Sequence, residues 1–212
     1  MGKTILDLIS PLLTSPISNY VAAMKTAEAV FADPRFDIST GLRRRHFLAQ
    51  VLHETGGLSI ATENMNYSAK GLMATWPSRF KTIDDTQAYI HNPKVLANKV
   101  YGSRMGNDPA GDDGWNFRGH GMLQITGKES YLAAKKFFAA EAAPPDFVAT
   151  PDLVNSADWA LKVACWEWTE KNCNDPADDD DIETVTRKIN GGLIGLSSRQ
   201  AWYDKLAFIE EI

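Results

Sequence analysis

The sequence is poor in the residues that build disulfide and metal sites. Its two cysteines, Cys165 and Cys173, cannot form a disulfide framework and lack CxxC spacing, so we expect buried, reduced thiols. The chain also has only four histidines. A zinc-protease motif of the HExxH type beginning at His53 would need a second histidine at position 57, which is glycine. No metal site is therefore expected.

Positive charge and long apolar runs are also scarce. The formal net charge is −5, whereas sequence-independent binding to nucleic acid usually needs a basic face, so no nucleic-acid partner is expected. Residues 1–16 are briefly apolar but contain Asp7, Pro11 and Pro16, which makes them a poor signal peptide and too short a membrane span. We expect a chain made in the cytoplasm, with no membrane insertion.

Apolar residues recur at helical spacing along most of the chain, which predicts a mainly α fold. Residues 102–121 are rich in glycine and are expected to form a loop or hairpin, followed by a short strand over 123–126. The expected helices run over 16–29, 40–55, 68–73, 93–101, 128–138, from Ser156 onward, 182–189 and 198–209, the last with Trp202, Leu206 and Ile209 on one face.

Paired carboxylates are the chemistry that remains, because nucleophile-elbow and phosphate-loop motifs are both absent. Glu54 lies at the end of an apolar helix, and Glu63 follows nine residues later beyond a short loop. Glycoside hydrolysis needs one carboxylic acid to protonate the leaving oxygen and one carboxylate to activate water. We expect an apolar setting for Glu54, against Val51 and Leu52, and a wetter, hydrogen-bonded one for Glu63. Two surface acids would show the same spacing.

Side chains suited to sugar binding gather in the loop-rich half of the chain. Aromatic rings bind the C–H faces of sugars, and amides or arginine forks bind their hydroxyls. Each ring taken singly is more often part of a core than a sugar platform. The residues concerned are Tyr67, Trp76, Tyr101, Trp115 and Phe117, with Asn64, Asn66, Asn107, Asn116, Arg118 and Gln124 among them.

Five separated segments, in order, resemble glycoside hydrolase family 19, and its phage endolysin and bacterial branch more than the plant chitinases. The similarity covers about residues 40–205, and the Glu54–Glu63 connection lacks the longer insert of the plant enzymes. The segments are His-Glu-Thr-Gly-Gly at 53–57, Glu-Asn-Met-Asn-Tyr-Ser at 63–68, Tyr-Gly-Ser-Arg-Met-Gly-Asn at 101–107, Gly-Trp-Asn-Phe-Arg-Gly-His-Gly-Met-Leu-Gln-Ile-Thr-Gly at 114–127 and Ile-Asn-Gly-Gly at 189–192.

The resemblance implies a lysozyme-like, two-lobed helical fold with a catalytic cleft and an inverting mechanism without a cofactor. Residues 1–212 would form a single catalytic domain, with a larger lobe over 1–62 and 112–212 and a smaller one over 63–111. By residue match, Glu54 would be the general acid and Glu63 the general base. Thr126 would help to hold the attacking water.

The resemblance also suggests which residues bind the sugar. Gln124 and Asn190 match positions that line the cleft, and Tyr67, Trp115 and Arg118 are expected to contact the substrate with them. Two departures concern substrate choice. His120 stands where family members often have arginine, and Ser130 stands near a sugar-binding asparagine of the plant enzymes.

The expected function is an endolysin-type muramidase that cuts peptidoglycan as a monomer, made in the host bacterial cytoplasm and acting on the periplasmic wall after release. Three alternatives stay open at this stage. A chitinase would use the same chemistry, and a lytic transglycosylase would need one glutamate and leave anhydro-sugar ends. A non-catalytic module that binds wall glycan would need neither glutamate.

Overall fold

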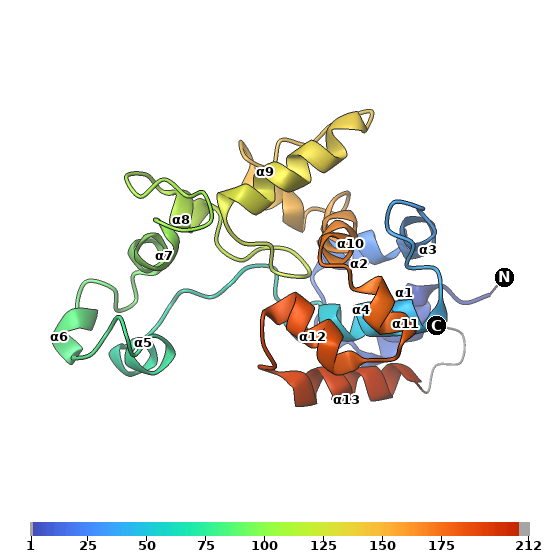
Figure 1. Ribbon diagram of the computed structural model, residues 1–212, viewed down its shortest axis with the longest axis horizontal. Coiled ribbons are helices and arrows are strands. Elements are labelled where there is room, and N and C mark those ends of the chain that lie inside the picture. The colour runs from blue at the N-terminus through green and yellow to red at the C-terminus, as the bar shows by residue number, and fades with distance from the viewer. Residues whose placement is uncertain (1, 208–212) are drawn as a thin grey trace. The chain divides into compact units, whose positions relative to one another are not determined.

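The computed structural model describes residues 2–207, and these are mainly helical (Figure 1). Their β structure is limited to isolated bridge residues at Thr62, His120 and Ile125, of which His120 pairs with Ile125. The helices are α1 (Ile5–Ile9), α2 (Ser18–Met24), α3 (Ala27–Phe31), α4 (Gly41–Glu54), α5 (Ala69–Thr75), α6 (Ile83–Thr86), α7 (Pro93–Tyr101), α8 (Asp113–Asn116), α9 (Lys128–Phe137), α10 (Ala160–Glu170), α11 (Asn174–Asp178), α12 (Ile182–Asn190) and α13 (Leu196–Ala207), with 3-10 turns at Ser10–Leu12, Phe138–Ala140 and Pro151–Asn155.

The chain divides into two compact units. Unit 1 comprises Met1–Ala61, His120–Ile125 and Asp152–Ile212, and unit 2 comprises Thr62–Gly119 and Thr126–Pro151. This division is drawn at other boundaries than the expected lobes, because contacts group α9 with the segment that holds α5 to α8. The single catalytic domain stays a prediction.

Helix α4 forms the centre of unit 1 and packs against α11, α12 and α13 (Figure 1). The Thr40 hydroxyl begins this helix by accepting a hydrogen bond from the Arg43 N–H. Its apolar side is fully buried, with the Phe47 ring in edge contact with the rings of Phe31 and Trp168. The C-terminal end of α4, where Glu54 lies, is therefore fixed by the core of the unit.

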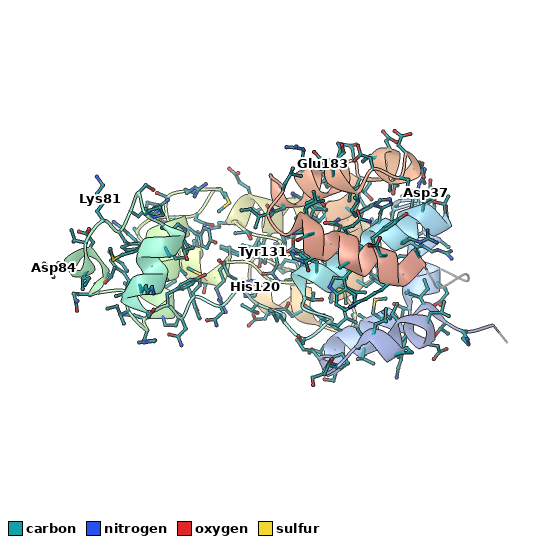
Figure 2. All side chains as sticks on the ribbon, turned by 90° about the horizontal axis from the view of Figure 1, so that it is seen from below. Asp37, Lys81, Asp84, His120, Tyr131 and Glu183 are labelled. Atoms are coloured by element: carbon teal, nitrogen blue, oxygen red, sulfur yellow. The ribbon has the colours of Figure 1, made fainter. Side chains whose placement is uncertain are left out.

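Unit 2 has its own smaller core. Its residues come from α5, α7 and the segments around them: Met65, Leu72, Phe80, Leu96, Ala97 and Val100. Tyr67 and Trp115 are partly buried against this cluster. The charged side chains of Lys81 and Asp84 are exposed at and beside α6 (Figure 2).

Two helix starts marked by local signals, at Ser68 and Pro93, were confirmed, whereas the start expected at Pro16 was wrong, because α2 begins at Ser18 with Ile17 in the cap position. Ser68 caps α5 through the Gly71 N–H, and α7 begins at Pro93 after Asn92, as the sequence predicts. The strand over 123–126 was wrong, because Ile125 is the one residue of that segment in a β bridge, with His120. Ser156 was also wrong as a cap.

The hydroxyl of Ser156 is buried without a hydrogen-bond partner, because a 3-10 turn over Pro151–Asn155 precedes it and Trp159 takes the cap position of α10. Helix α8 lies inside the predicted loop and was not expected. The expected end of the last helix, with Ile209, lies outside the described residues.

Candidate active site

Glu54 is the last residue of α4. Gly56 and Gly57 follow with φ of +54° and +74°, a left-handed turn that glycine adopts at low cost and that ends the helix. The Glu54 side chain is 19% exposed, and its carboxylate accepts a hydrogen bond from the Arg199 guanidinium of α13. The acid is thus held by an ion pair where its helix ends.

Arg199 connects three helices of unit 1. The side chain is 1% exposed, and its Nη1 donates to Gln50 Oε1 of α4 at 2.5 Å. The Gln50 amide lies 3.4 Å from the Thr186 hydroxyl of α12. The apolar setting expected for Glu54 was therefore wrong, because its nearest partner is a buried cation.

Arg199 was not predicted as a site residue, although its position on the apolar face of α13 could have indicated it. Arg199, Tyr203 and Leu206 are the buried residues of α13, spaced four and three positions apart on one face. A charge on an otherwise apolar helix face indicates a buried partner, because an unpaired buried cation is very costly.

Glu167 of α10 is a second carboxyl close to this network. Burial, and to a lesser degree the nearby Glu54 charge, raise the pKa of Glu167 to about 7, against the opposing effect of Lys171. Its side chain is 14% exposed, and Lys171 Nζ lies 3.7 Å away. Unit 1 therefore contains a carboxyl that titrates near neutrality beside Glu54.

The raised pKa of Glu167 predicts that the folded state loses stability as pH rises. A folded-state pKa above the unfolded value of 4.5 means that folding binds the proton more tightly. The contribution is present below pH 4.5 and is lost as pH rises through about 7, about 2–4 kcal/mol in all. Urea unfolding should show a smaller decline between pH 5 and pH 8 for Glu167→Gln than for the parent. Glu170→Gln, an exposed glutamate of the same helix, is the control and should behave as the parent.

His53 and Asn190 lie on the same unit as Glu54. His53 Nδ1 lies 2.9 Å from the Ser198 hydroxyl, and a Cβ on Gly195 would lie 2.5 Å from His53 Nε2, so only glycine fits there. Asn190 ends α12, is exposed, and its amide lies 3.5 Å from the Ile194 carbonyl. The segment between α12 and α13 therefore packs closely, through Gly195, against the His53 imidazole next to Glu54.

Glu63 lies on unit 2, together with its hydrogen-bond partners Tyr101 and Gly119. Its backbone N–H donates to the Gly119 carbonyl at 2.8 Å, and the Gly119 N–H lies 3.4 Å from Glu63 Oε2. The Tyr101 hydroxyl lies 2.9 and 3.0 Å from the two carboxylate oxygens. The hydrogen bonding expected for Glu63 was confirmed.

The wetter setting expected for Glu63 was wrong. Burial raises the pKa of its carboxyl, while the Tyr101 and Gly119 hydrogen bonds and the Arg118 charge act in the opposite direction. The physical reason is that unit 2 closes its own polar groups around this side chain and so replaces water by protein donors.

Aromatic and cationic groups accompany Glu63 on unit 2. The Arg118 guanidinium stacks 3.6 Å from the centre of the Trp115 ring and donates to the Trp115 carbonyl at 2.7 Å. The rings of Tyr67 and Trp76 meet edge to face at 5.1 Å. The structure thus brings Tyr67, Trp115 and Arg118 together in one unit with Glu63, and their sugar contacts stay predictions.

The remaining predicted site residues follow one another in the chain. His120 is 1% exposed, and its Nε2 lies 3.6 Å from Asp152 Oδ1. Gln124 has φ of +61°, and its amide donates to the Gly121 carbonyl at 3.0 Å. Thr126 is half-buried. Sugar contacts by His120 and Gln124, and the water-holding role of Thr126, stay predictions.

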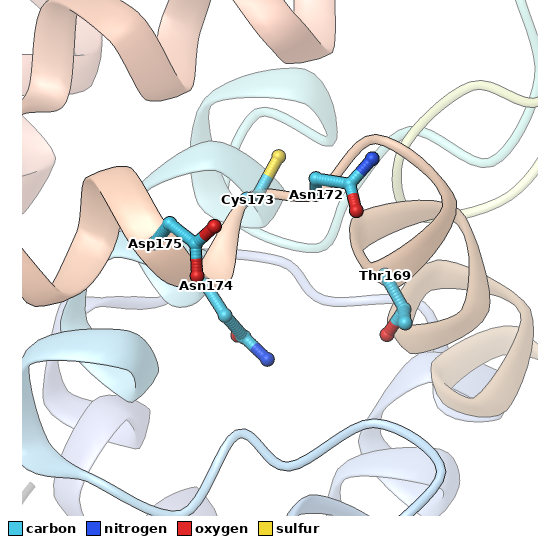
Figure 3. A pocket seen from close by; sticks show the side chains of 5 residues that line it. All are labelled: Thr169, Asn172, Cys173, Asn174 and Asp175. Atoms are coloured by element: carbon cyan, nitrogen blue, oxygen red, sulfur yellow. The ribbon is translucent and has the colours of Figure 1, made fainter.

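Residues 2–207 contain neither a metal-binding cluster nor a membrane-spanning helix. No group of three or more His, Cys, Asp or Glu side chains there could hold a metal ion, and no helix there is long and apolar enough to cross a bilayer. A pocket of about 180 Å³ opens beside α11 (Figure 3). The Asn174 amide on its wall is already engaged with Trp168 Nε1 and the Phe36 carbonyl.

Comparison with known proteins identifies the family. No family model matches the chain. A glycosyl hydrolase family 19 domain-containing protein of Haemophilus influenzae is 38% identical over 166 residues, which are 78% of this chain and 78% of that protein.

Solved structures give the same answer for the fold. Chitinase C from Streptomyces griseus HUT6037 has a TM-score of 0.65 at 17% identity, with 98% of this chain and 94% of that chain covered. A bacterial family 19 chitinase has a TM-score of 0.58 at 24% identity, with 96% of this chain and 91% of that chain covered. A class IV chitinase from Zea mays has a TM-score of 0.56 at 18% identity, with 100% of this chain and 87% of that chain covered. The mainly α, lysozyme-like fold was confirmed, and the chain belongs to glycoside hydrolase family 19.

Proposed function

We propose that this glycoside hydrolase is an endolysin-type muramidase, which hydrolyses the β-1,4 bond between N-acetylmuramic acid and N-acetylglucosamine with inversion. One observation carries the chemistry. Each of the two glutamates has a dedicated donor in its own unit, Arg199 for Glu54 and Tyr101 for Glu63. The enzyme would act as a monomer on the periplasmic wall, after release from the host bacterial cytoplasm.

The proposed reaction is a single displacement. Glu54 gives its proton to the glycosidic oxygen while the bond from that oxygen to the anomeric carbon breaks. Glu63 takes a proton from a water molecule, whose oxygen bonds to the anomeric carbon from the opposite face. The products are two shorter glycans, one with an inverted anomeric centre, and the two carboxyl groups have exchanged protonation states. Solvent restores them before the next turnover.

The charge of unit 2 supports a wall polymer as substrate. Unit 2 contains ten Lys and Arg against nine Asp and Glu, whereas unit 1 contains twelve against eighteen. The acidic excess of the chain therefore belongs to unit 1. Muramic acid carries a lactyl group, and its stem peptides carry carboxylates, which chitin lacks. Arg118, stacked beside the base, is the group on unit 2 best suited to such an anion.

A chitinase is the second candidate, because the three solved structures named above are chitinases. It would use the same glutamates on a polymer of N-acetylglucosamine alone. The rings of Tyr67 and Trp115 suit either polymer, since both present the same C–H faces.

Product analysis tests this proposal. The enzyme is incubated with purified peptidoglycan and, in parallel, with chitooligosaccharides, and the products are separated by mass spectrometry. Peptidoglycan fragments with new N-acetylmuramic acid reducing ends are expected, with slower release from chitooligosaccharides. Chitooligomer release without any peptidoglycan cleavage would make the protein a chitinase. Fragments ending in anhydro-muramic acid would show that the reaction is transglycosylation and not hydrolysis.

Thr126→Ala tests the proposed role of the hydroxyl in holding the attacking water. The loss of one positioning hydrogen bond should lower kcat by about ten- to a hundredfold with little change in stability. Thr126→Ser, which keeps the hydroxyl, should retain most of the rate. Steady-state kinetics on the preferred polymer measure both, and an alanine variant within twofold of the parent would exclude the role.

A further inference from the structure

The Tyr101 hydroxyl is placed between both oxygens of Glu63, at 2.9 and 3.0 Å. One O–H group can donate to only one oxygen at a time, but this position restrains the carboxylate on both sides. The Gly119 N–H approaches Oε2 from another direction, at 3.4 Å. The plane of the carboxylate is therefore fixed by the protein before any substrate binds.

The phenol is itself held in place by buried polar contacts. Tyr101 ends α7, and its carbonyl accepts a hydrogen bond from the Asn107 amide at 2.9 Å. Asn107 is 7% exposed, and its own Oδ1 accepts from the Lys128 N–H at 2.9 Å. A buried amide with both ends satisfied fixes the chain where it stands.

The helix that carries the phenol is also locked to α8. Asn98 of α7 accepts a hydrogen bond from the Trp115 N–H at 2.8 Å. A Cβ on Gly114 would lie 2.7 Å from the Ala97 carbonyl oxygen, so the two helices touch through a glycine. Tyr101 is therefore part of a rigid support, which is what a precisely oriented base requires.

We propose that Tyr101 is a positioning residue, whose hydroxyl orients the Glu63 carboxylate and stabilises its charged form. This inference rests on the proposed role of Glu63 as the base. It gives Tyr101 a different use from the sugar platform suggested by its aromatic ring. The residue acts through Glu63 and need not touch the polymer.

The chemistry favours a phenol in this position. Burial, together with the Glu63 charge, raises the pKa of Tyr101 above its ordinary range, so the hydroxyl stays a donor at every working pH. Burial raises the pKa of Glu63 and so favours its neutral form, whereas the Tyr101 hydrogen bond acts in the opposite direction. A neutral donor offsets part of that cost and weakens the base less than a second cation would.

The other charged and titratable groups around the pair are few. Arg118 lowers the pKa of Glu63, and the Glu63 charge contributes to the raised pKa of Tyr67. Arg104 acts on Tyr101 in the direction that lowers its pKa, and Tyr67 acts in the opposite direction. Removing the Tyr101 hydroxyl takes away its contacts with the two Glu63 oxygens, whereas the Gly119 N–H contact with Oε2 is unchanged by the substitution.

Tyr101→Phe in the full chain tests the inference, with Tyr89→Phe as the matched control. Tyr89 lies in the same unit, and its ring packs on Phe80 at 5.3 Å. NMR titration of the Glu63 side-chain carboxyl should show a midpoint about one pH unit higher in Tyr101→Phe than in the parent, as expected for losing a hydrogen bond to a charged group. The midpoint in Tyr89→Phe should equal that of the parent.

Kinetics give a second readout. The acidic limb of the plot of kcat against pH should move to higher pH by the same amount in Tyr101→Phe. The plateau kcat should fall about tenfold while KM stays within twofold. Equal Glu63 midpoints in Tyr101→Phe and the parent would overturn the inference, whatever the activity. Activity in Glu63→Gln equal to that of the parent would overturn the base role separately, and the titration would still decide what Tyr101 does to Glu63.

Discussion

Glu54→Gln should lower kcat by at least about 10²–10⁴-fold, the contribution usual for a general acid, and so reduce hydrolysis to the background of most assays. The substitution keeps the size of the side chain and an oxygen that can still accept the Arg199 hydrogen bond. The fold should therefore survive, because the partner of a buried guanidinium is not removed. The amide lacks the acidic proton that a carboxylic acid can give to the leaving oxygen.

The experiment compares turnover of the preferred polymer with the circular dichroism and unfolding midpoint of each variant. Glu170→Gln, an exposed glutamate of unit 1, controls for the loss of a negative charge. Glu63→Gln should be as inactive as Glu54→Gln, since hydrolysis by inversion needs both groups. A folded Glu54→Gln enzyme that retains half of the parent rate would remove Glu54 from the reaction.

Arg199→Met should be the most destabilising single change in unit 1 among those considered, by about 3–5 kcal/mol. The guanidinium is 1% exposed and supports both Glu54 and Gln50. Methionine fills much of the same volume, so the cost comes from the carboxylate and amide oxygen that lose their donor. The 19% exposure of Glu54 lets water recover part of this cost, which favours the lower end of the range.

Urea denaturation followed by far-UV circular dichroism measures the change. Arg187→Met is the matched control, because Arg187 pairs with Glu183 on the surface of α12 and both side chains are more than half exposed. That pair should contribute well under 1 kcal/mol. Arg199→Lys should lie between the two, since an ammonium keeps the charge but cannot span both oxygens as a fork does. Equal midpoints for Arg199→Met and Arg187→Met would show that the buried pair contributes no net stability.

Local signals in the sequence were sufficient for most of the helices. Thr40 and Ser68 mark helix starts because each satisfies a backbone N–H that the helix leaves free, and Pro93 can only open a helix. Helix α8 was missed because four residues carry too little periodicity to stand out from a glycine-rich loop. Ser156 failed as a cap because tertiary packing buries its hydroxyl.

The candidate site was predictable in its residues and less so in their surroundings. The motifs singled out Glu54 and Glu63, whose catalytic roles stay predictions. The partner of Glu54 lies 145 residues away and that of Glu63 lies 38 residues away, so neither belongs to the local pattern. The electrostatic settings expected for the two glutamates were wrong for this reason, since both depend on donors that only the folded chain brings near.

The long separation between Glu54 and Arg199 also has a meaning for synthesis. A ribosome releases Glu54, Glu63 and Thr126 well before it adds α13, which packs against α4 and carries the arginine. The growing chain thus holds every residue assigned to the chemistry while the acid still lacks its counter-ion. Synthesis of α13, rather than of the motifs, supplies that counter-ion, and a chain that stops before α13 should be inert toward its substrate.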